Sequence, residues 1–256
     1  MAQDQALLGR IALVTGASRG IGRAAALGLA QGGAHVIAVA RTVGALEELD
    51  DEIKKIGGTA TLVPLDLKDY PGIDRMGAAI FDRWGKLDAL FANAGILGTL
   101  TPLTHLQPKV WDDLLAINLT ANWRLIRSLD PLLRLSDAGR ALFVSSAAAH
   151  YNRPFWGGYA ITKAALETMV KTYAGELTGT TVKANLLNPG PTRTGMRAAA
   201  MPGEDPMTLP APEELAPVIV ELLSPGCDIH GELIHFREPQ QPIPGRIVQI
   251  TPHTDS

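Results

Sequence analysis

The feature that most constrains the fold is a regular alternation of short β-rich runs with helix-length segments between residues 10 and 236. Parallel strands need a long crossover between them, usually a helix, so this alternation is typical of successive βαβ units. Several runs are almost continuously apolar, as in strands that helices cover on both faces. The pattern predicts an α/β fold with one doubly wound parallel sheet of about seven strands, at 10–16, 34–41, 59–66, 87–95, 139–146, 181–190 and 232–236, and helices at 21–32, 43–56, 71–84, 108–135, 157–178 and 213–223.

Two segments depart from this alternation. Residues 191–212 carry several prolines between a predicted strand and a predicted helix. Since this loop leaves the carboxyl end of a strand, where ligands bind in open α/β sheets, we expect it to form a lid. Residues 238–256 form a Pro-rich tail that could add an edge strand, contact a partner subunit or lie on the surface. We therefore expect one dinucleotide-binding and catalytic domain over 1–237, followed by this tail.

The composition excludes several classes of protein. A length of 256 residues, 46% hydrophobic residues and a net charge of -3 are those of an ordinary soluble domain, with no basic excess for a nucleic-acid partner. The apolar stretch near the N-terminus is too short for export or for a membrane span. The single cysteine, Cys227, cannot form an intramolecular disulfide, and the six histidines show no metal-ligand spacing. We expect a cytoplasmic protein with no metal site.

A glycine-rich turn follows the first predicted strand. Residues 15–22 read TGASRGIG and lead into the first predicted helix. Glycines at such a turn let the backbone approach a pyrophosphate, and the helix N-terminus offers free N–H groups. The spacing is one residue wider than Gly-x-Gly-x-x-Gly, and an unliganded β–α turn is the alternative. Its position between the first strand and the first helix favours a dinucleotide site.

The second predicted strand indicates which dinucleotide is bound. An acidic residue about 20 positions after the turn would bind the ribose of NAD, whereas an arginine would hold the 2′-phosphate of NADP. Arg41 stands at that distance, beside Ala40 rather than an acid, and Arg19 lies within the turn. Ordinary surface arginines are the alternative. The pattern favours NADP(H), with NAD(H) as the less favoured cofactor.

A tyrosine and a lysine stand four residues apart in YAITK, residues 159–163. On a helix, Tyr159 and Lys163 share one face, which places a cation near a phenol. Taken alone, the pair could be a boundary tyrosine and a solvated lysine on an amphipathic helix. A nearby ammonium stabilises a phenolate, so Lys163 could bring the pKa of Tyr159 from about 10 toward neutrality. Tyr159 would then act as a catalytic acid or base.

These motifs together resemble the short-chain dehydrogenase/reductase family of the single-domain type, over residues 9–236. The resemblance rests on TGASRGIG (15–22), Asp66–Leu67, NAG (93–95), IN ending in Asn118, VSS (144–146), YAITK (159–163) and NPGPTRT (188–194), in the family's order. Ser146 lies 13 residues before Tyr159, the interval of the family's catalytic pair, and Ser145 does not match it. The run after NPG is also similar to a little-characterised bacterial group labelled oxoacyl reductase-like. The resemblance implies a Rossmann-like fold.

The resemblance also implies roles for individual residues. Tyr159 would be the acid/base, Ser146 would polarise the substrate oxygen, and Lys163 would also bind the nicotinamide ribose. Asn118 would hold a water molecule that links Lys163 to solvent. The resemblance, taken together with the glycine-rich turn and the two arginines, also implies a cofactor site. Its residues would be Gly16, Ser18, Arg19, Gly20, Ile21, Gly22, Arg41, Asp66, Leu67, Asn93, Ala94, Gly95, Tyr159, Lys163, Pro189, Gly190, Thr192 and Thr194.

The expected function is hydride transfer between NADP(H) and a carbonyl or secondary alcohol. The alternatives are an NAD-linked secondary alcohol dehydrogenase and a non-catalytic protein that senses a dinucleotide. Four residues before the catalytic helix could line a substrate pocket or simply pack, namely His150, Tyr151, Phe155 and Trp156. No residue names the small-molecule substrate. The resemblance further implies a homodimer or homotetramer that pairs through the helices at 108–135 and 157–178.

Overall fold

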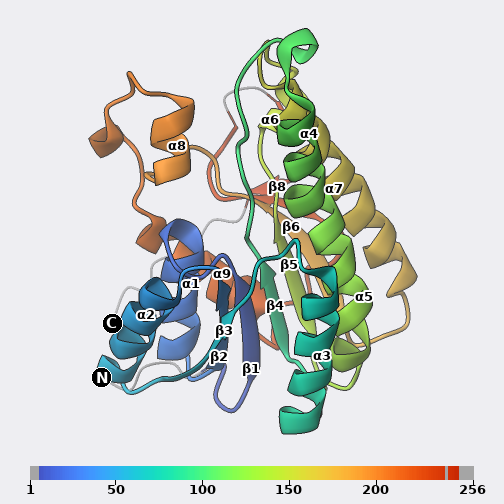
Figure 1. Cartoon of the computed structure of the whole chain (residues 1–256). Helices are drawn as coiled ribbons and strands as arrows, with labels where there is room; N and C mark the ends of the chain where they lie inside the picture. The colour runs from blue at the N-terminus through green and yellow to red at the C-terminus, as the bar shows by residue number, and fades with distance from the viewer. Residues whose placement is uncertain (1–5, 240–241, 248–256) are drawn as a thin grey trace, which may run out of the picture.

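The computed structural model describes residues 6–239 and 242–247, which form a parallel sheet with helices on both faces (Figure 1). Within these residues the sheet has eight strands in the order β3-β2-β1-β4-β5-β6-β7-β8. They are β1 (Ile11–Thr15), β2 (His35–Ala40), β3 (Thr59–Pro64), β4 (Ala89–Ala92), β5 (Arg140–Val144), β6 (Lys183–Asn188), β7 (Leu233–His235) and β8 (Arg246–Ile247). The predicted Rossmann-like, doubly wound α/β fold is confirmed, with one strand more than the seven expected.

Most predicted helices are present with nearly the expected bounds. They are α1 (Gly20–Gln31), α2 (Val43–Lys55), α3 (Tyr70–Trp84) and α7 (Gly157–Glu176). Local signals explain where α3 begins and ends. The Asp69 carboxylate accepts a hydrogen bond from the Gly72 N–H at 3.0 Å, and Gly85 ends the helix with a φ of 71°. Side-chain capping at the start and a left-handed glycine at the end satisfy backbone groups that a helix leaves unpaired.

Two predicted helices are subdivided. The segment predicted as one helix over 108–135 consists of α4 (Pro108–Leu114), the π-helix η2 (Leu115–Thr120) and α5 (Ala121–Arg134). A π-helical turn accommodates an extra residue in the helical ladder, and the sequence period does not reveal it. The helix predicted at 213–223 starts as the 3₁₀ turn η4 (Pro212–Leu215) and continues as α9 (Ala216–Leu223). Four short elements were not predicted, namely η1 (Leu103–His105), α6 (Ala148–Tyr151), α8 (Gly195–Ala200) and η3 (Pro206–Thr208).

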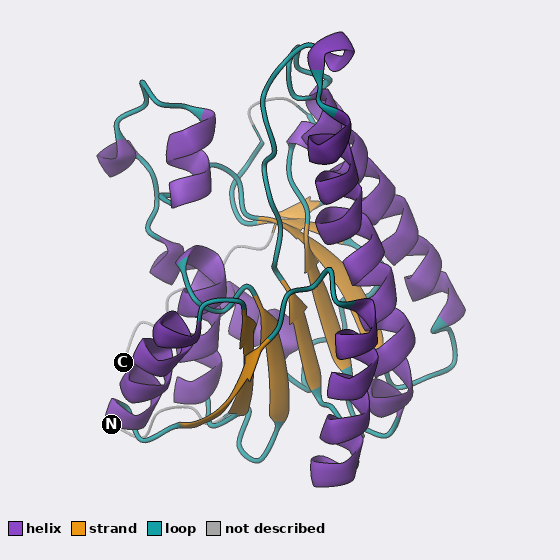
Figure 2. Ribbon diagram, viewed as in Figure 1, coloured by secondary structure: helices purple, strands orange, loops and turns teal. Residues whose placement is uncertain are grey.

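The strands bury both of their faces, which explains their continuous apolar character. Ala12 and Val14 of β1 face the layer of α1, α2 and α9, whereas Ile11 and Leu13 face the layer of α3, α5 and α7 (Figure 2). This alternation follows from the two-residue period of a strand. All four side chains are at least 90% buried. The sheet is therefore a rigid platform whose carboxyl edge carries the loops.

The chain reverses its direction of winding at β1. This strand lies between β2 and β4, with Thr15 beside Val39 on one side and Ala92 on the other. The crossovers leaving β1 and β4 go to opposite sides of this point, so the loops at the two carboxyl ends separate. In open α/β sheets, that separation is where ligands bind.

Residues 191–212 fold back on themselves beyond the sheet edge, as the orange segment around α8 in Figure 1 shows. The Arg193 N–H donates to the Pro210 carbonyl at 2.9 Å and closes the base of the segment. Within it, the Nε and Nη2 groups of Arg197 each donate to the Glu204 carboxylate at 2.6 Å. Such a two-point ion pair is geometrically specific. The segment predicted as an irregular loop therefore contains a short helix and an ion pair between two of its own residues.

The C-terminal tail returns to the sheet. In β8, Arg246 and Ile247 pair in parallel with Ile234 and His235 of β7. Of the three possibilities for the tail, an added edge strand is thus confirmed for these two residues. The remainder of the tail at 240–241 and 248–256 lies outside the described residues.

Among the described helices, none has the combination of length and apolar character that crossing a bilayer requires.

Candidate active site

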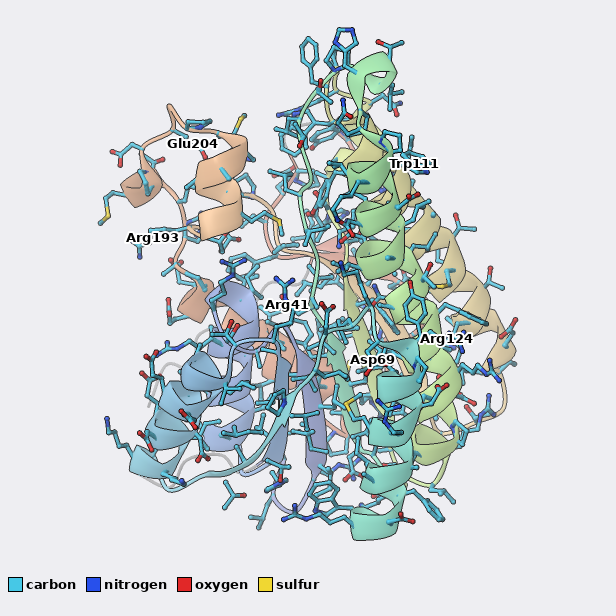
Figure 3. The ribbon with its side chains drawn as sticks, in the orientation of Figure 1. Arg41, Asp69, Trp111, Arg124, Arg193 and Glu204 are labelled. Carbon is cyan, nitrogen blue, oxygen red and sulfur yellow. The ribbon has the colours of Figure 1, made fainter. Side chains whose placement is uncertain are left out.

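A cavity of about 670 Å³ opens at the carboxyl edge of the sheet, beside the point where β1 separates from β4. This volume lies within the usual range for cofactor and substrate sites. Its walls come from the glycine-rich turn, the ends of β2, β4, β5 and β6, helix α7 and the segment 191–212. Arg41, which is labelled in Figure 3 and lies below the segment around α8, is one of its lining residues. Segments far apart in the sequence therefore share one concave site.

The glycine-rich turn is shaped by close backbone contacts. Gly16 has a φ of +66°, which favours glycine, and a Cβ added to Gly22 would lie 2.2 Å from the Gly16 carbonyl oxygen. The Asn93 side chain donates to the Thr15 carbonyl at 3.1 Å, and the Thr15 hydroxyl accepts from the Asn93 and Ala94 N–H groups, each at 3.1 Å. The turn after β4 therefore holds the glycine-rich turn in place.

Three consecutive residues at the end of β5 meet one face of α7. The Lys163 ammonium donates to the Val144 carbonyl at 2.7 Å, and the side chains of Ser146 and Tyr159 are hydrogen-bonded. Between them, the Ser145 hydroxyl donates to the Glu167 carboxylate at 2.5 Å. Positions 159, 163 and 167 are one helical turn apart and so share a face. This set of three contacts is called the β5–α7 ladder below.

Burial dominates the protonation of the tyrosine and the lysine. Tyr159 is 8% exposed and Lys163 is 3% exposed. Burial raises the pKa of the Tyr159 phenol to about 12, and the hydrogen bond with Ser146 partly opposes this rise. Burial lowers the pKa of Lys163 to about 8, and the Glu167 carboxylate partly opposes this fall. Both shifts have the sign expected when a charged form loses its hydration.

The expectation that Lys163 brings the pKa of Tyr159 toward neutrality is therefore not met in this structure. The Lys163 Nζ lies 5.7 Å from the centroid of the Tyr159 ring, and its hydrogen bond goes to the Val144 carbonyl. Burial of the phenol is the larger effect, and it raises the pKa of Tyr159 instead of lowering it. It therefore favours the protonated phenol over the phenolate.

Asn118 lies behind the cavity, fully buried in the π-helix η2. Its side-chain oxygen accepts from the Ile96 N–H at 2.8 Å, and its amide nitrogen donates to the Ile96 carbonyl at 2.9 Å and to the Thr162 hydroxyl at 3.1 Å. A Cβ on Gly95 would lie 3.3 Å from the Asn118 oxygen and 3.6 Å from the Lys163 Nζ. Asn118 therefore ties the loop after β4 to the catalytic helix.

The end of the cavity that Arg41 marks collects the residues expected to select the nucleotide. Arg41 and Arg19 are exposed at its rim, and Asp66 and Leu67 line it after β3. The Asp66 carboxylate accepts from the Lys68 N–H at 3.0 Å, which forms a local turn. This end of the cavity therefore carries two cations. Ala40 lies beside them and is uncharged, whereas an acidic side chain at that position would repel a phosphate.

The loop after β6 forms the opposite wall. Gly190 has a φ of +66°, and its N–H donates to the Asn188 side chain at 3.1 Å. The amide nitrogen of Asn188 contacts Nδ1 of His235 in β7 at 3.0 Å. Thr192 is buried, and Thr194 caps α8 by accepting from the Arg197 N–H at 3.2 Å. This loop is therefore braced from the sheet on one side and leads into the 191–212 segment on the other.

Most residues expected at the site do line this cavity. They are Gly16, Ser18, Arg19, Gly20, Ile21, Arg41, Asp66, Leu67, Asn93, Ala94, Gly95, Ser146, Tyr159, Lys163, Pro189, Gly190, Thr192 and Thr194. Gly22 and Asn118 are not among its lining residues, since they act from behind by close packing and by hydrogen bonds. The cavity therefore brings together chain positions up to 178 residues apart, from 16 to 194.

The comparisons with known proteins agree with this geometry. The family model described as short chain dehydrogenase matches residues 10–205. The chain belongs to the short-chain dehydrogenase family. YciK, an uncharacterized oxidoreductase of Escherichia coli (strain K12), is 38% identical over 217 residues, covering 84% of this chain and 86% of that protein.

Solved structures of short-chain dehydrogenases share the fold closely. One from Pseudomonas syringae has a TM-score of 0.89 at 39% identity and covers 93% of this chain and 98% of its own. Another, from Shigella flexneri 2a str. 301, is complexed with NADP and has a TM-score of 0.87 at 37% identity, covering 91% and 98%. The similarity thus extends over almost the whole length of both chains in each comparison.

The expectations for the substrate side of this short-chain dehydrogenase are met in part. Tyr151 and Trp156 line the cavity. His150 does not, because its ring lies against Glu167, with Nε2 3.0 Å from the carboxylate. Phe155 is 58% exposed, has a φ of +73° and is not a lining residue. Of the two possibilities left open for these four residues, lining the cavity therefore holds for Tyr151 and Trp156 and not for His150 and Phe155.

Several residues of this family member's site were missed by the sequence reasoning. Val144 acts through its carbonyl, which no side-chain pattern reveals. Glu167 could have been found as the next i, i+4 position after Lys163, but such a position is usually solvated. Residues 237–239 line the cavity from the C-terminal segment, as do Met196 and Arg197 from α8. Their approach depends on how the chain ends pack on the sheet, and no local signal in the sequence shows this.

Proposed function

We propose that this short-chain dehydrogenase transfers a hydride between NADP(H) and a carbonyl or secondary alcohol, with Tyr159 as the acid/base. The observation that carries the proposal is the phenol of Tyr159, which is hydrogen-bonded to Ser146 and lines a cavity of about 670 Å³. Reduction of a carbonyl requires a proton on oxygen as well as a hydride on carbon. The phenol supports the first requirement, and bound NADPH would supply the hydride.

The residues around the cavity fit a dinucleotide phosphate. Gly16 and Gly22 leave the backbone free of side chains where a pyrophosphate would approach the start of α1. Arg41 and Arg19 would hold the adenosine 2′-phosphate through charge-assisted hydrogen bonds. The solved structure from Shigella flexneri with NADP, at 37% identity, supports this choice over NAD(H). Pro189, Gly190, Thr192 and Thr194 would surround the nicotinamide end.

The remaining residues would position the reacting oxygen. Ser146 would donate a hydrogen bond to the substrate oxygen as negative charge develops there, and Tyr159 would then release its proton to that oxygen. The Lys163 ammonium would favour the phenolate left behind, since a positive charge nearby stabilises it. Asn118 would hold the loop after β4 in a fixed position relative to Lys163, because it bonds both that loop and the neighbouring Thr162. Because its pKa is raised to about 12, the phenol carries its proton at neutral pH, which is the form that carbonyl reduction requires.

Replacing Tyr159 with phenylalanine should abolish turnover and leave NADPH binding nearly unchanged, because it deletes the proton donor but not the nucleotide site. The measurement is a screen of aldehydes, ketones and 3-oxoacyl thioesters with NADPH and NADH, followed by nicotinamide absorbance, with NADPH affinity from fluorescence titration. The matched control is Tyr173→Phe on the same helix, whose hydroxyl donates to Asp130 at 2.8 Å outside the cavity. Activity of Tyr159→Phe within about tenfold of wild type would refute the role.

Replacing Arg41 with alanine should weaken NADPH binding by roughly ten- to a hundredfold and change NADH binding little, because a hydrogen bond between charged groups contributes about 1.5–3 kcal/mol. Affinities are compared at one moderate salt concentration. Arg75→Ala, an exposed arginine on α3 that does not line the cavity, removes the same charge as a control. Equal affinity of the wild-type protein for NADH and NADPH would contradict this proposal and favour an NAD-linked enzyme.

The reduction rate should be highest below about pH 8 and fall above it, because the pKa of the buried Lys163 is lowered to about 8. Lys163 is charged below that pH and loses its charge as the pH rises through it. Tyr159 does not limit the rate in this range, because its pKa is raised to about 12 and it stays protonated. The check is kcat at saturating NADPH as a function of pH. A rate that rises through this range would be inconsistent with Lys163 acting as a cation.

We expect the active form to contain a second copy of the chain, packed through the outer faces of α5 and α7. Trp123 on α5 is 45% exposed and Ile161 on α7 is 42% exposed, and these helices lie side by side in Figure 1. Exposed apolar side chains gathered on adjacent helices are typical of interfaces between subunits. Light scattering should give two or four times the chain mass of 27.2 kDa. A single-chain mass at micromolar concentration would count against this arrangement.

A further inference from the structure

The β5–α7 ladder contains a carboxylate that the proposed chemistry does not use. Glu167 is 5% exposed, one helical turn beyond Lys163. Its Oε1 accepts from the Ser145 hydroxyl at 2.5 Å, and its Oε2 lies 3.0 Å from Nε2 of His150. Buried carboxylates are costly unless they are paired, so a side chain held this way needs an explanation.

The ladder places Glu167 where it can act on both catalytic groups. Ser145 lies between Val144, whose carbonyl accepts from Lys163, and Ser146, which bonds Tyr159. A contact that holds Ser145 therefore also fixes the position of its two neighbours along the backbone. Ser145 lies at the cavity wall but is only 1% exposed, and its hydroxyl donates to Glu167. Ser146, which bonds Tyr159, is therefore the serine whose hydroxyl we expect to meet a substrate.

We propose that Glu167 is a positioning residue that holds the end of β5 in register with α7 and keeps Lys163 positively charged. The catalytic part of this inference rests on the proposed function, whereas its electrostatic part concerns the folded protein alone. Glu167 does not touch the cavity, since it is not among the lining residues, so it acts through Ser145 and Lys163.

The surrounding charges are consistent with this role. Among the described residues, three other ionisable groups face Glu167 and Lys163, namely Tyr159 on α7, His150 on α6 and His235 on β7. Burial lowers the pKa of His235, which favours its neutral form. Burial also lowers the pKa of Lys163 to about 8, and the carboxylate of Glu167 opposes that fall. Without this carboxylate, the ammonium would lose its proton at a lower pH.

Two variants separate the two effects. Glu167→Gln keeps the shape and an oxygen that can accept from Ser145, but it removes the charge. Ser145→Ala keeps the charge and deletes the hydrogen bond. Glu176→Gln is the matched control, because it removes the same charge from the exposed end of the same helix. The pKa of Lys163 is measured by NMR titration of protein labelled with carbon-13 at the lysine Cε, and the signal is assigned with Lys163→Arg.

Glu167→Gln should lower the pKa of Lys163 by about one unit relative to wild type, and Glu176→Gln should not. The fall in reduction rate at high pH should move to lower pH by the same amount. Ser145→Ala should lower kcat about tenfold, with the pKa of Lys163 and the affinity for NADPH nearly unchanged. A lysine titration in Glu167→Gln that matches Glu176→Gln would overturn the inference, and so would wild-type kcat in Ser145→Ala.

The design keeps this inference separate from the proposed function. If no carbonyl is reduced with NADPH, the proposed function fails, and the lysine titration still decides whether Glu167 controls the charge of Lys163. If reduction is present but neither variant differs from the control, the proposed function stands and Glu167 is only a core residue. Ser145→Ala deletes a single oxygen, so the positioning role can be overturned even if Glu167→Gln does not fold.

Discussion

The hydrogen bond from the Lys163 ammonium to the Val144 carbonyl connects the catalytic helix to the sheet, and the rest of the site depends on it. A buried ammonium is tolerated only where acceptors and a nearby negative charge replace its hydration. The backbone of β5 supplies the acceptor, and Glu167 supplies the charge. Because that carbonyl belongs to the strand, Lys163 is positioned by the most rigid part of the molecule. Ser146, two residues after Val144, then meets Tyr159 at a defined place.

The same principle extends to the other walls of the cavity. Asn93 binds the glycine-rich turn, Asn118 binds the loop after β4, and Asn188 binds the loop after β6. Each asparagine uses its side-chain amide to satisfy backbone groups of a loop at the carboxyl edge. Loops at this edge would otherwise have unpaired N–H and carbonyl groups, which are costly when buried. These asparagines thus hold the loops that line the cavity against the rest of the fold.

The protonation of the site follows from burial more than from the pairing of Tyr159 with Lys163. Both side chains are almost fully enclosed, so each is driven toward its neutral form. This raises the pKa of the tyrosine and lowers that of the lysine, so that the phenol retains its proton while the lysine titrates near pH 8. The four-residue spacing of the two side chains on one helix does not reveal this burial, because the burial comes from the other elements packed over them.

The sequence alone was sufficient for the alternation of strands and helices, for the glycine-rich turn and for the shared face of Tyr159 and Lys163, because these depend on local periodicity. It also placed the cavity at one edge of the sheet, since the carboxyl ends of parallel strands meet there. Only the tertiary structure decided that Ser145 pairs with Glu167, that η2 is a π-helix, that His150 turns away from the cavity and that residues 237–239 reach it. These features join residues from separate elements, and burial, which sets the pKa of Tyr159, depends on every element packed around it.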